Sequence, residues 1–119
     1  MTSKRELKAA YKREVQPMGV FVLLNRATRT AYIASSANLT GAKNALDFTL
    51  KTGSHINRAL VADWKAHGAA AFAFEIVDRL ESKAGETDYR AELKTLLKMR
   101  LEAGLADGTG APLTLVPLH

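Results

Sequence analysis

Gly19-Val20-Phe21-Val22-Leu23-Leu24 is an almost wholly apolar run, with the length and the β-branched content of a strand that is covered on both faces. Polar, turn-forming residues follow at 25–28, and Thr30-Ala31-Tyr32-Ile33-Ala34 has the composition of a second short strand. Two strands this close in sequence are expected to pair with each other. We therefore predict an antiparallel hairpin over residues 19–34.

Helical periodicity predicts four helices around this hairpin. The first begins at a capping box formed by Ser3 and Glu6, and Gln16-Pro17 ends it because proline disfavours helical geometry in the residue before it. Ser54 is expected to cap the third helix and to leave Ile56 facing the core, and Thr87 or Asp88 to cap the fourth. The predicted ranges are 3–15, about 39–51, 56–67 and 88–103.

A third strand is expected at 72–77, where phenylalanine and isoleucine alternate with smaller or polar residues. The element order is then α-β-β-α-α-β-α, which predicts a small mixed α/β (α+β) sandwich with a three-stranded sheet flanked by helices. We divide the chain into a basic N-terminal helix (1–17), the main domain (18–103) and a C-terminal tail (104–119). The pattern leaves open whether the tail docks as an extended segment or stays loose.

The composition limits the classes of protein to which the chain can belong. Its 119 residues fit one domain, and apolar and charged fractions of 47% and 24% are ordinary for a globular protein. The absence of cysteine excludes disulfides, thiol nucleophiles and cysteine-based metal sites. No run approaches the roughly 20 apolar residues of a membrane helix, and the first residues lack the apolar core of a signal peptide. We therefore expect a cytoplasmic protein with no membrane partner.

The formal net charge of +5 is concentrated at the start of the chain. Residues 1–30 hold seven basic and two acidic residues, whereas the remainder holds ten of each. Lys4, Lys8 and Lys12 recur at helical spacing and would form one basic row. Such an asymmetry can attract phosphate backbones, although a solvated helix face that aids solubility is the alternative interpretation.

Several of these segments resemble the GIY-YIG nuclease domains. Gly19-Val20-Phe21 and Tyr32-Ile33-Ala34-Ser35 look like the two strand motifs of that family. Ala62-Asp63-Trp64-Lys65-Ala66-His67-Gly68 and Phe72-Ala73-Phe74-Glu75-Ile76 then follow in the family's order of elements. The resemblance covers roughly residues 18–101 and implies a GIY-YIG-like fold.

The resemblance also implies an activity and a set of site residues. Active members cleave a phosphodiester bond with one divalent metal, Mg²⁺ or Mn²⁺, and use two strand tyrosines, an arginine, a histidine and a metal-binding glutamate. Tyr32 matches the second tyrosine and His55 matches a loop histidine. Glu92 best matches the catalytic and metal-binding glutamate, with Glu86 or Glu81 as alternatives.

This chain departs from the family pattern at four positions. The first tyrosine falls on Phe21, the final glycine of the second motif on Ala34, the arginine at about Ala42, and a further histidine at about Leu46. Lys43 is next to the arginine position but points about 100° round the helix. Losing one preorganised donor typically costs about 10²–10³ in rate, so nuclease activity at the usual level is not expected.

The candidate residues have structural interpretations as well. Tyr32 can be a strand aromatic with its hydroxyl at a wet edge, His55 a capping or surface residue, and Glu92 a solvated helix residue. Three hypotheses therefore remain. The first is a degenerate domain that binds nucleic acid, DNA rather than RNA, through Lys4, Lys8, Lys12 and Lys43. The others are an active metal-dependent endonuclease with a modified site, and a protein-interaction module on the same fold.

Overall fold

A computed structural model describes residues 17–81, 88–107 and 109–118. The helix predicted at 3–15, with Lys4, Lys8 and Lys12, lies outside these residues. The elements are β1 (Met18–Asn25), β2 (Thr30–Ser36), α2 (Leu39–Thr52), α3 (Arg58–His67), the 3₁₀ turn η1 (Ala69–Ala71), β3 (Phe72–Leu80), α4 (Arg90–Ala103) and β4 (Thr114–Pro117).

The sheet has four strands in the order β3-β1-β2-β4. β1 pairs antiparallel with both β2 and β3, so the predicted hairpin and the third strand are confirmed. The predicted count of three strands is wrong, because the C-terminal tail docks parallel to β2, with Thr30 opposite Thr114. The Leu118 amide closes this pairing by donating to the Ile33 carbonyl at 2.9 Å.

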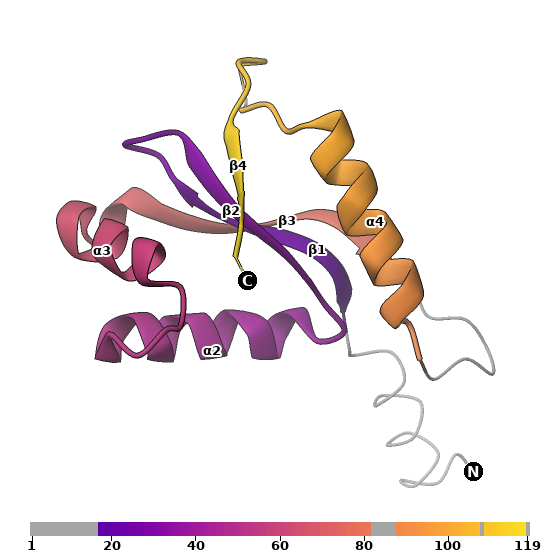
Figure 1. The fold of residues 1–119 in the computed structure, drawn as a ribbon, viewed down its shortest axis with the longest axis horizontal. Helices are drawn as coiled ribbons and strands as arrows, with labels where there is room; N and C mark the ends of the chain where they lie inside the picture. The colour runs from indigo at the N-terminus through magenta and orange to yellow at the C-terminus, as the bar shows by residue number, and fades with distance from the viewer. Residues whose placement is uncertain (1–16, 82–87, 108, 119) are drawn as a thin grey trace, which may run out of the picture.

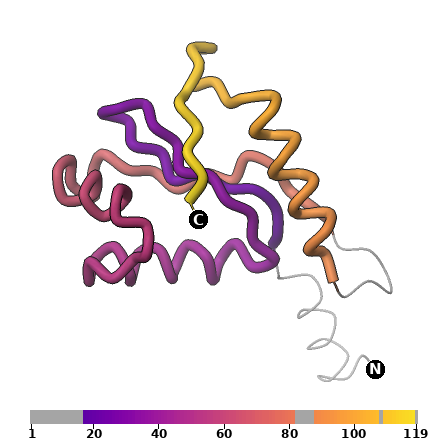
Figure 2. Tube along the Cα trace, in the orientation of Figure 1, coloured from indigo at the N-terminus to yellow at the C-terminus, as the bar shows by residue number. Residues whose placement is uncertain are grey.

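Helices cover both faces of the sheet, as Figures 1 and 2 show, with α2 and α3 on one side and α4 on the other. Phe21 and Leu23 belong to a buried cluster that includes the leucines of α2 and α3. Val20, Val22 and Leu24, which alternate with them along β1, belong to a second cluster on which α4 packs. All eight residues of β1 are buried, as expected for a strand covered on both faces.

The helix boundaries follow from side-chain caps. Asn38 begins α2 by accepting from the Gly41 amide at 2.9 Å. Asn57, rather than Ser54, caps α3 by accepting from the Leu60 amide. The helix therefore begins after Ile56, which is 81% exposed instead of facing the core. In α4, Tyr89 occupies the cap position, whereas Asp88 lies one residue earlier and accepts from the Arg90 amide.

A close approach between β1 and β3 requires glycine at position 19. Gly19 has a φ of +150°, and a Cβ atom there would lie 2.0 Å from the Asp78 carbonyl oxygen. The pairing register shifts between Val20 and Phe21, which marks a bulge beside this contact. The first glycine of the strand motif is therefore a requirement of the fold itself.

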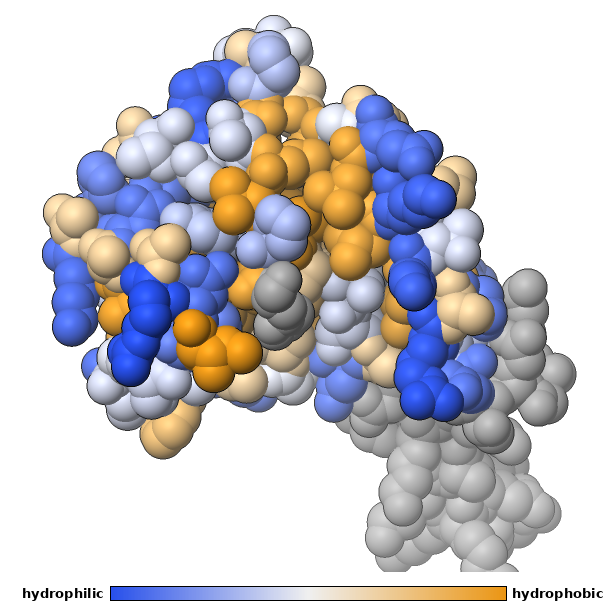
Figure 3. All heavy atoms as spheres, viewed as in Figure 1, coloured by the Kyte–Doolittle hydropathy of each residue, from blue (hydrophilic) through white to orange (hydrophobic). Residues whose placement is uncertain are grey.

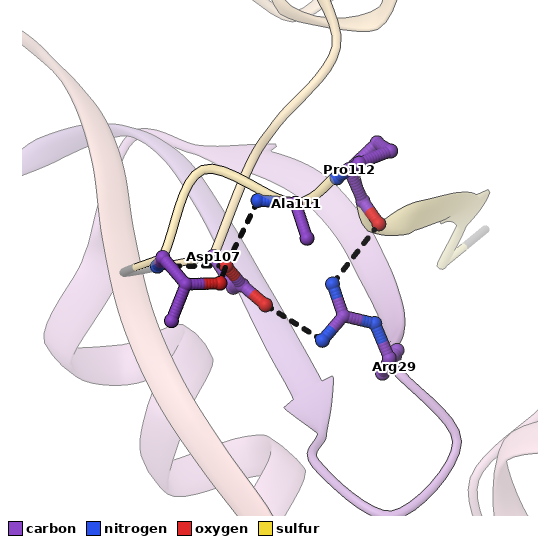
Figure 4. A network of polar contacts seen from close by, with 5 residues as sticks. Arg29, Asp107, Ala111 and Pro112 are labelled. Atoms are coloured by element: carbon purple, nitrogen blue, oxygen red, sulfur yellow. Dashed lines mark hydrogen bonds and ion pairs between the residues drawn. The ribbon is translucent and has the colours of Figure 1, made fainter.

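An ion pair joins the hairpin turn to the loop before β4, as Figure 4 shows. The Arg29 guanidinium lies 2.6 Å from Asp107 Oδ2 and also donates to the Pro112 carbonyl at 3.3 Å. Asp107 Oδ1 accepts from the Thr109 amide, the Thr109 hydroxyl and the Ala111 amide. These contacts lower the pKa of Asp107 well below its usual range, chiefly through the Thr109 hydrogen bonds.

Candidate functional site

A cavity of about 320 Å³ opens between β1 and α2. Four of the positions that the family resemblance assigns to the active site lie in its wall, although they are far apart in the sequence. They are Phe21, Ala42, Leu46 and His55. The remaining lining residues are Ser35, Ser36, Ala45, Thr49, Ser54, Ile56 and Leu118.

The chemical character of this cavity is apolar with hydroxyl groups, and its lining includes no carboxylate, lysine or arginine. The Phe21 ring stacks on Phe74 with centroids 5.0 Å apart, so its position is set by core packing. His55 is buried, and its Nδ1 accepts from the Asn57 amide at 3.0 Å. The cavity therefore holds one imidazole and no other ionisable lining group.

Tyr32 does not line this cavity, although it lies on the same face of the sheet as Phe21. Its buried hydroxyl donates to Asp63 Oδ2 at 2.9 Å and so ties β2 to α3. Burial, together with the hydrogen bond and negative charge of Asp63, raises the pKa of Tyr32 to about 12. The hydroxyl is therefore protonated at neutral pH and engaged in a structural contact.

Asp63 is a residue that the sequence analysis missed. Its second carboxylate oxygen lies 3.6 Å from His67 Nε2, one helical turn further along α3. The Asp63-His67 spacing of four residues was visible in the sequence as a side-chain pair on one helix face. Nothing local, however, indicated that Tyr32 would reach Asp63 from a different element.

Glu92 lies away from both Tyr32 and His55. It belongs to α4, which covers the opposite face of the sheet through Leu96 and Leu97. Its Oε2 atom is buried and has no hydrogen-bond partner in the part of the chain that the structure describes. The expectation that Tyr32, His55 and Glu92 border one concave surface is therefore wrong, because α4 and α2 pack on different faces. Of the alternatives, Glu81 is exposed just after β3, and Glu86 lies outside the described residues.

The residues that the structure describes do not fit a divalent metal. Over residues 17–81, 88–107 and 109–118, no group of three or more histidine, aspartate or glutamate side chains could hold an ion. The cavity supplies only the His55 imidazole, whereas Mg²⁺ and Mn²⁺ prefer carboxylate and other oxygen ligands. Among the same residues, no helix is long and apolar enough to cross a membrane.

A basic row lies along α4. Arg90, Lys94 and Lys98 are exposed and follow one another at intervals of four residues, which places them on one helix face. Figure 3 shows hydrophilic side chains along α4 beside a hydrophobic strip between α4 and β4. Arg90 pairs with Asp88 at 2.9 Å, whereas Lys94 and Lys98 make no ion pair with the described residues. The spacing of these cations was the signal in the sequence that could have found them.

On the other side of the molecule, Lys43 is exposed on α2, directly after Ala42. Its amine is not among the groups that line the cavity.

Comparison with known proteins adds no assignment to this geometry: a scan of family models, a search of curated proteins and a search of solved structures each found no significant match.

Proposed function

We propose that this chain is a GIY-YIG nuclease-like domain that binds nucleic acid and cleaves it little or not at all. The observation that carries the proposal is the convergence of Phe21, Ala42, Leu46 and His55 on one cavity. The resemblance assigned these positions to an active site from sequence order alone. In the structure, Ala42 and Leu46 lie one turn apart on α2 and pack in one core cluster with Phe21, and His55 joins them from the loop after α2.

The chemistry of the cavity supports the absence of cleavage. Phosphoryl transfer places negative charge on the phosphate oxygens, and catalysis requires preorganised donors or cations at that point. Phe21 and Leu46 cannot move a proton, and Ala42 cannot stabilise a developing charge. Tyr32, which keeps the family's hydroxyl, is bonded to Asp63.

The charges on α4 support binding to a polyanion. Asp88 compensates the charge of Arg90, but Lys94 and Lys98 have no ion pair with the described residues and repel each other by about 0.2–0.5 kcal/mol, which phosphates would relieve. The row from Arg90 to Lys98 spans about 12 Å at the rise of an α-helix, which is enough to meet several successive phosphates. The N-terminal lysines Lys4, Lys8 and Lys12 would add to the same electrostatic attraction.

The test combines a binding and a cleavage assay on the full chain. Fluorescence anisotropy with labelled single- and double-stranded DNA and RNA should give binding that weakens steeply with salt. The same substrates, incubated with Mg²⁺ or Mn²⁺, should remain intact on a denaturing gel. Robust cleavage that Tyr32→Phe and Glu92→Ala abolish would instead favour an active endonuclease. No binding at low salt would favour the protein-interaction module.

A gain-of-function variant tests the assignment of the cavity. The combination Phe21→Tyr, Ala42→Arg and Leu46→His would return a hydroxyl, a cation and an imidazole to three positions of its wall. Because the structure places Glu92 on the other face, these changes alone are expected to strengthen substrate binding without restoring cleavage. An unchanged Kd for nucleic acid, in a variant that stays folded, would show that nucleic acid binds away from this cavity, as at the basic row of α4 on the other face of the sheet.

A further inference from the structure

The two edges of the sheet differ in how they are protected from other chains. β4 has four residues, ends in Pro117 and follows Pro112. Short edge strands and prolines are the usual means by which proteins prevent edge-to-edge pairing. β3, at the other edge, has nine residues and no proline.

The backbone direction along β3 follows from one hydrogen bond. The Arg26 amide donates to the Ala71 carbonyl at 2.9 Å, so the carbonyl just before β3 points toward β1. Because backbone groups alternate sides along an antiparallel strand, those of Phe72, Phe74 and Ile76 point to the outer edge. At this outer edge the Phe72 amide already donates to the Ala69 carbonyl of the 3₁₀ turn η1. Within the described part of the chain, no backbone hydrogen bond occupies the amides of Phe74 and Ile76 or the outward carbonyls of the three residues.

The side chains of the same three residues lie on one face of the sheet. Phe74 stacks on Phe21, and Phe72 packs against Trp64 with centroids 5.1 Å apart. Phe72 and Phe74 are half-buried, and Ile76 is 37% exposed, so this edge is apolar and accessible. Beyond Ile76, the bulge at the register shift bends β3 and ends the regular segment.

We propose that β3 pairs antiparallel with β3 of a second copy, about a two-fold axis at Phe74. This register places Phe74 opposite Phe74 and Phe72 opposite Ile76. The two Phe74 residues exchange hydrogen bonds, each Ile76 amide donates to the Phe72 carbonyl of the other copy, and the side chains form apolar pairs. It also places Glu75 opposite Ala73. A register centred on Glu75 would instead bring two carboxylates together, which is unfavourable.

The two-fold axis joins two four-stranded sheets into one continuous sheet. Both copies of α4 then lie on the same face, and their basic rows form one extended surface. The pairing uses few residues and belongs with the weaker interfaces, which bury less than about 1,200 Å². The dimer is therefore concentration-dependent, and it does not depend on nucleic-acid binding.

Sedimentation velocity over a range of concentrations tests this interface. Ile76→Lys places a cation opposite Phe72. Because the two-fold axis repeats this contact, the dimer contains the substitution at two places, and the dimerisation Kd should rise by at least about tenfold. Ile56→Lys makes the same change of charge at a site that is 81% exposed on the α2–α3 loop, and it should leave dimerisation unaltered. A monomer at every concentration, or equal effects of the two variants, would overturn the proposal.

Disulfide trapping tests the register even if Ile76→Lys proves unstable. The chain has no cysteine, so Ala73→Cys and Glu75→Cys each introduce a single thiol. In the proposed register, residue 73 of one copy faces residue 75 of the other in a close, non-hydrogen-bonded pair. An oxidised mixture of the two variants should cross-link more than either variant alone. Equal cross-linking in all three samples would contradict the register.

Discussion

Gly19 shows how strongly one residue can be constrained by a distant element. Replacing it with alanine would force a Cβ atom against the Asp78 carbonyl and keep an unfavourable φ. We expect Gly19→Ala to lower the free energy of unfolding by about 3 kcal/mol or more, measured by urea denaturation.

Gly53→Ala is the control. Gly53 also has a positive φ but no atom within 4 Å of the added Cβ, so a loss of about 1–2 kcal/mol is expected. Equal losses would show that backbone conformation, rather than the contact with β3, determines the effect.

Tyr32 offers a second test at the scale of one residue. Tyr32→Phe removes the donor to Asp63 and should cost about 1–2 kcal/mol of stability at neutral pH. A loss of unfolding free energy within this range in a denaturant titration, with an unchanged Kd for nucleic acid, would fit a structural role for the Tyr32 hydroxyl.

The pH dependence of that stability has a defined sign. The pKa of Tyr32 is raised from 10.0 to about 12 in the folded protein, so the folded state retains a proton that the unfolded state loses. Its contribution is complete below pH 10 and is lost as the pH rises to about 12. The wild type should therefore lose more stability than Tyr32→Phe across this window. Parallel pH profiles would contradict the contact.

At the scale of elements, the Arg29-Asp107 pair holds β4 in the sheet. Asp107→Asn should weaken the contact. The amides that hold the two ends of β4, Thr114 on the Arg29 carbonyl and Leu118 on the Ile33 carbonyl, should then exchange several-fold faster by mass spectrometry. Asp88→Asn is the matched control, because Asp88 also pairs with an arginine but lies at the start of α4. Unchanged exchange in Asp107→Asn would show that β4 docks without this pair.

The same pair predicts behaviour in acid. The pKa of Asp107 is depressed in the folded protein, so its contribution to stability is present above the usual carboxyl pKa near 4 and is lost as the pH falls further. The exchange of the β4 amides should therefore rise relative to that of β1 amides below about pH 4. In Asp107→Asn this relative change should disappear.

The basic row of α4 can be tested through salt dependence. For duplex DNA, log K should fall with log salt by roughly 0.9 per phosphate contact. Replacing Lys94 and Lys98 with glutamine removes up to two contacts and should flatten the slope by up to about 2. The double variant Lys51→Gln and Lys65→Gln makes the same charge change on α2 and α3, and should alter the slope less. A comparison with glutamine at Lys4, Lys8 and Lys12 would show how much the N-terminal segment contributes.

At the scale of the whole molecule, the positions of the carboxylates predict that Mg²⁺ and Mn²⁺ do not stabilise the folded state. A ligand that binds only the folded state raises stability by RT ln(1 + [L]/Kd). Because His55 lines the cavity without a carboxylate and Glu92 lies across the sheet, millimolar Mg²⁺ or Mn²⁺ should leave Tm unchanged in thermal scans. A rise in Tm that Glu92→Gln abolishes would show that Glu92 binds metal after all.

Much of the architecture was predictable from local sequence. The apolar runs located β1, β2 and β3, and the glycines at 53, 68 and 104 located the ends of the helices, because strand alternation and helix caps depend on neighbouring residues. Phe21, Ala42 and Leu46, the positions at which the resemblance to GIY-YIG domains expects site residues, line one cavity, and their role there stays a prediction.

Other features depended on residues distant in sequence. The tail of the chain has no strong periodicity, and only pairing with β2 makes Thr114–Pro117 a fourth strand. The helical pattern of α4 predicted that Glu92 would lie on a helix, but a pattern cannot say which face of the sheet that helix covers. The partner of Tyr32 likewise came from α3, 31 residues away. The sequence thus determined the elements and their charges, because these depend on local chemistry. The tertiary structure decided which side chains meet, because that depends on how the elements pack.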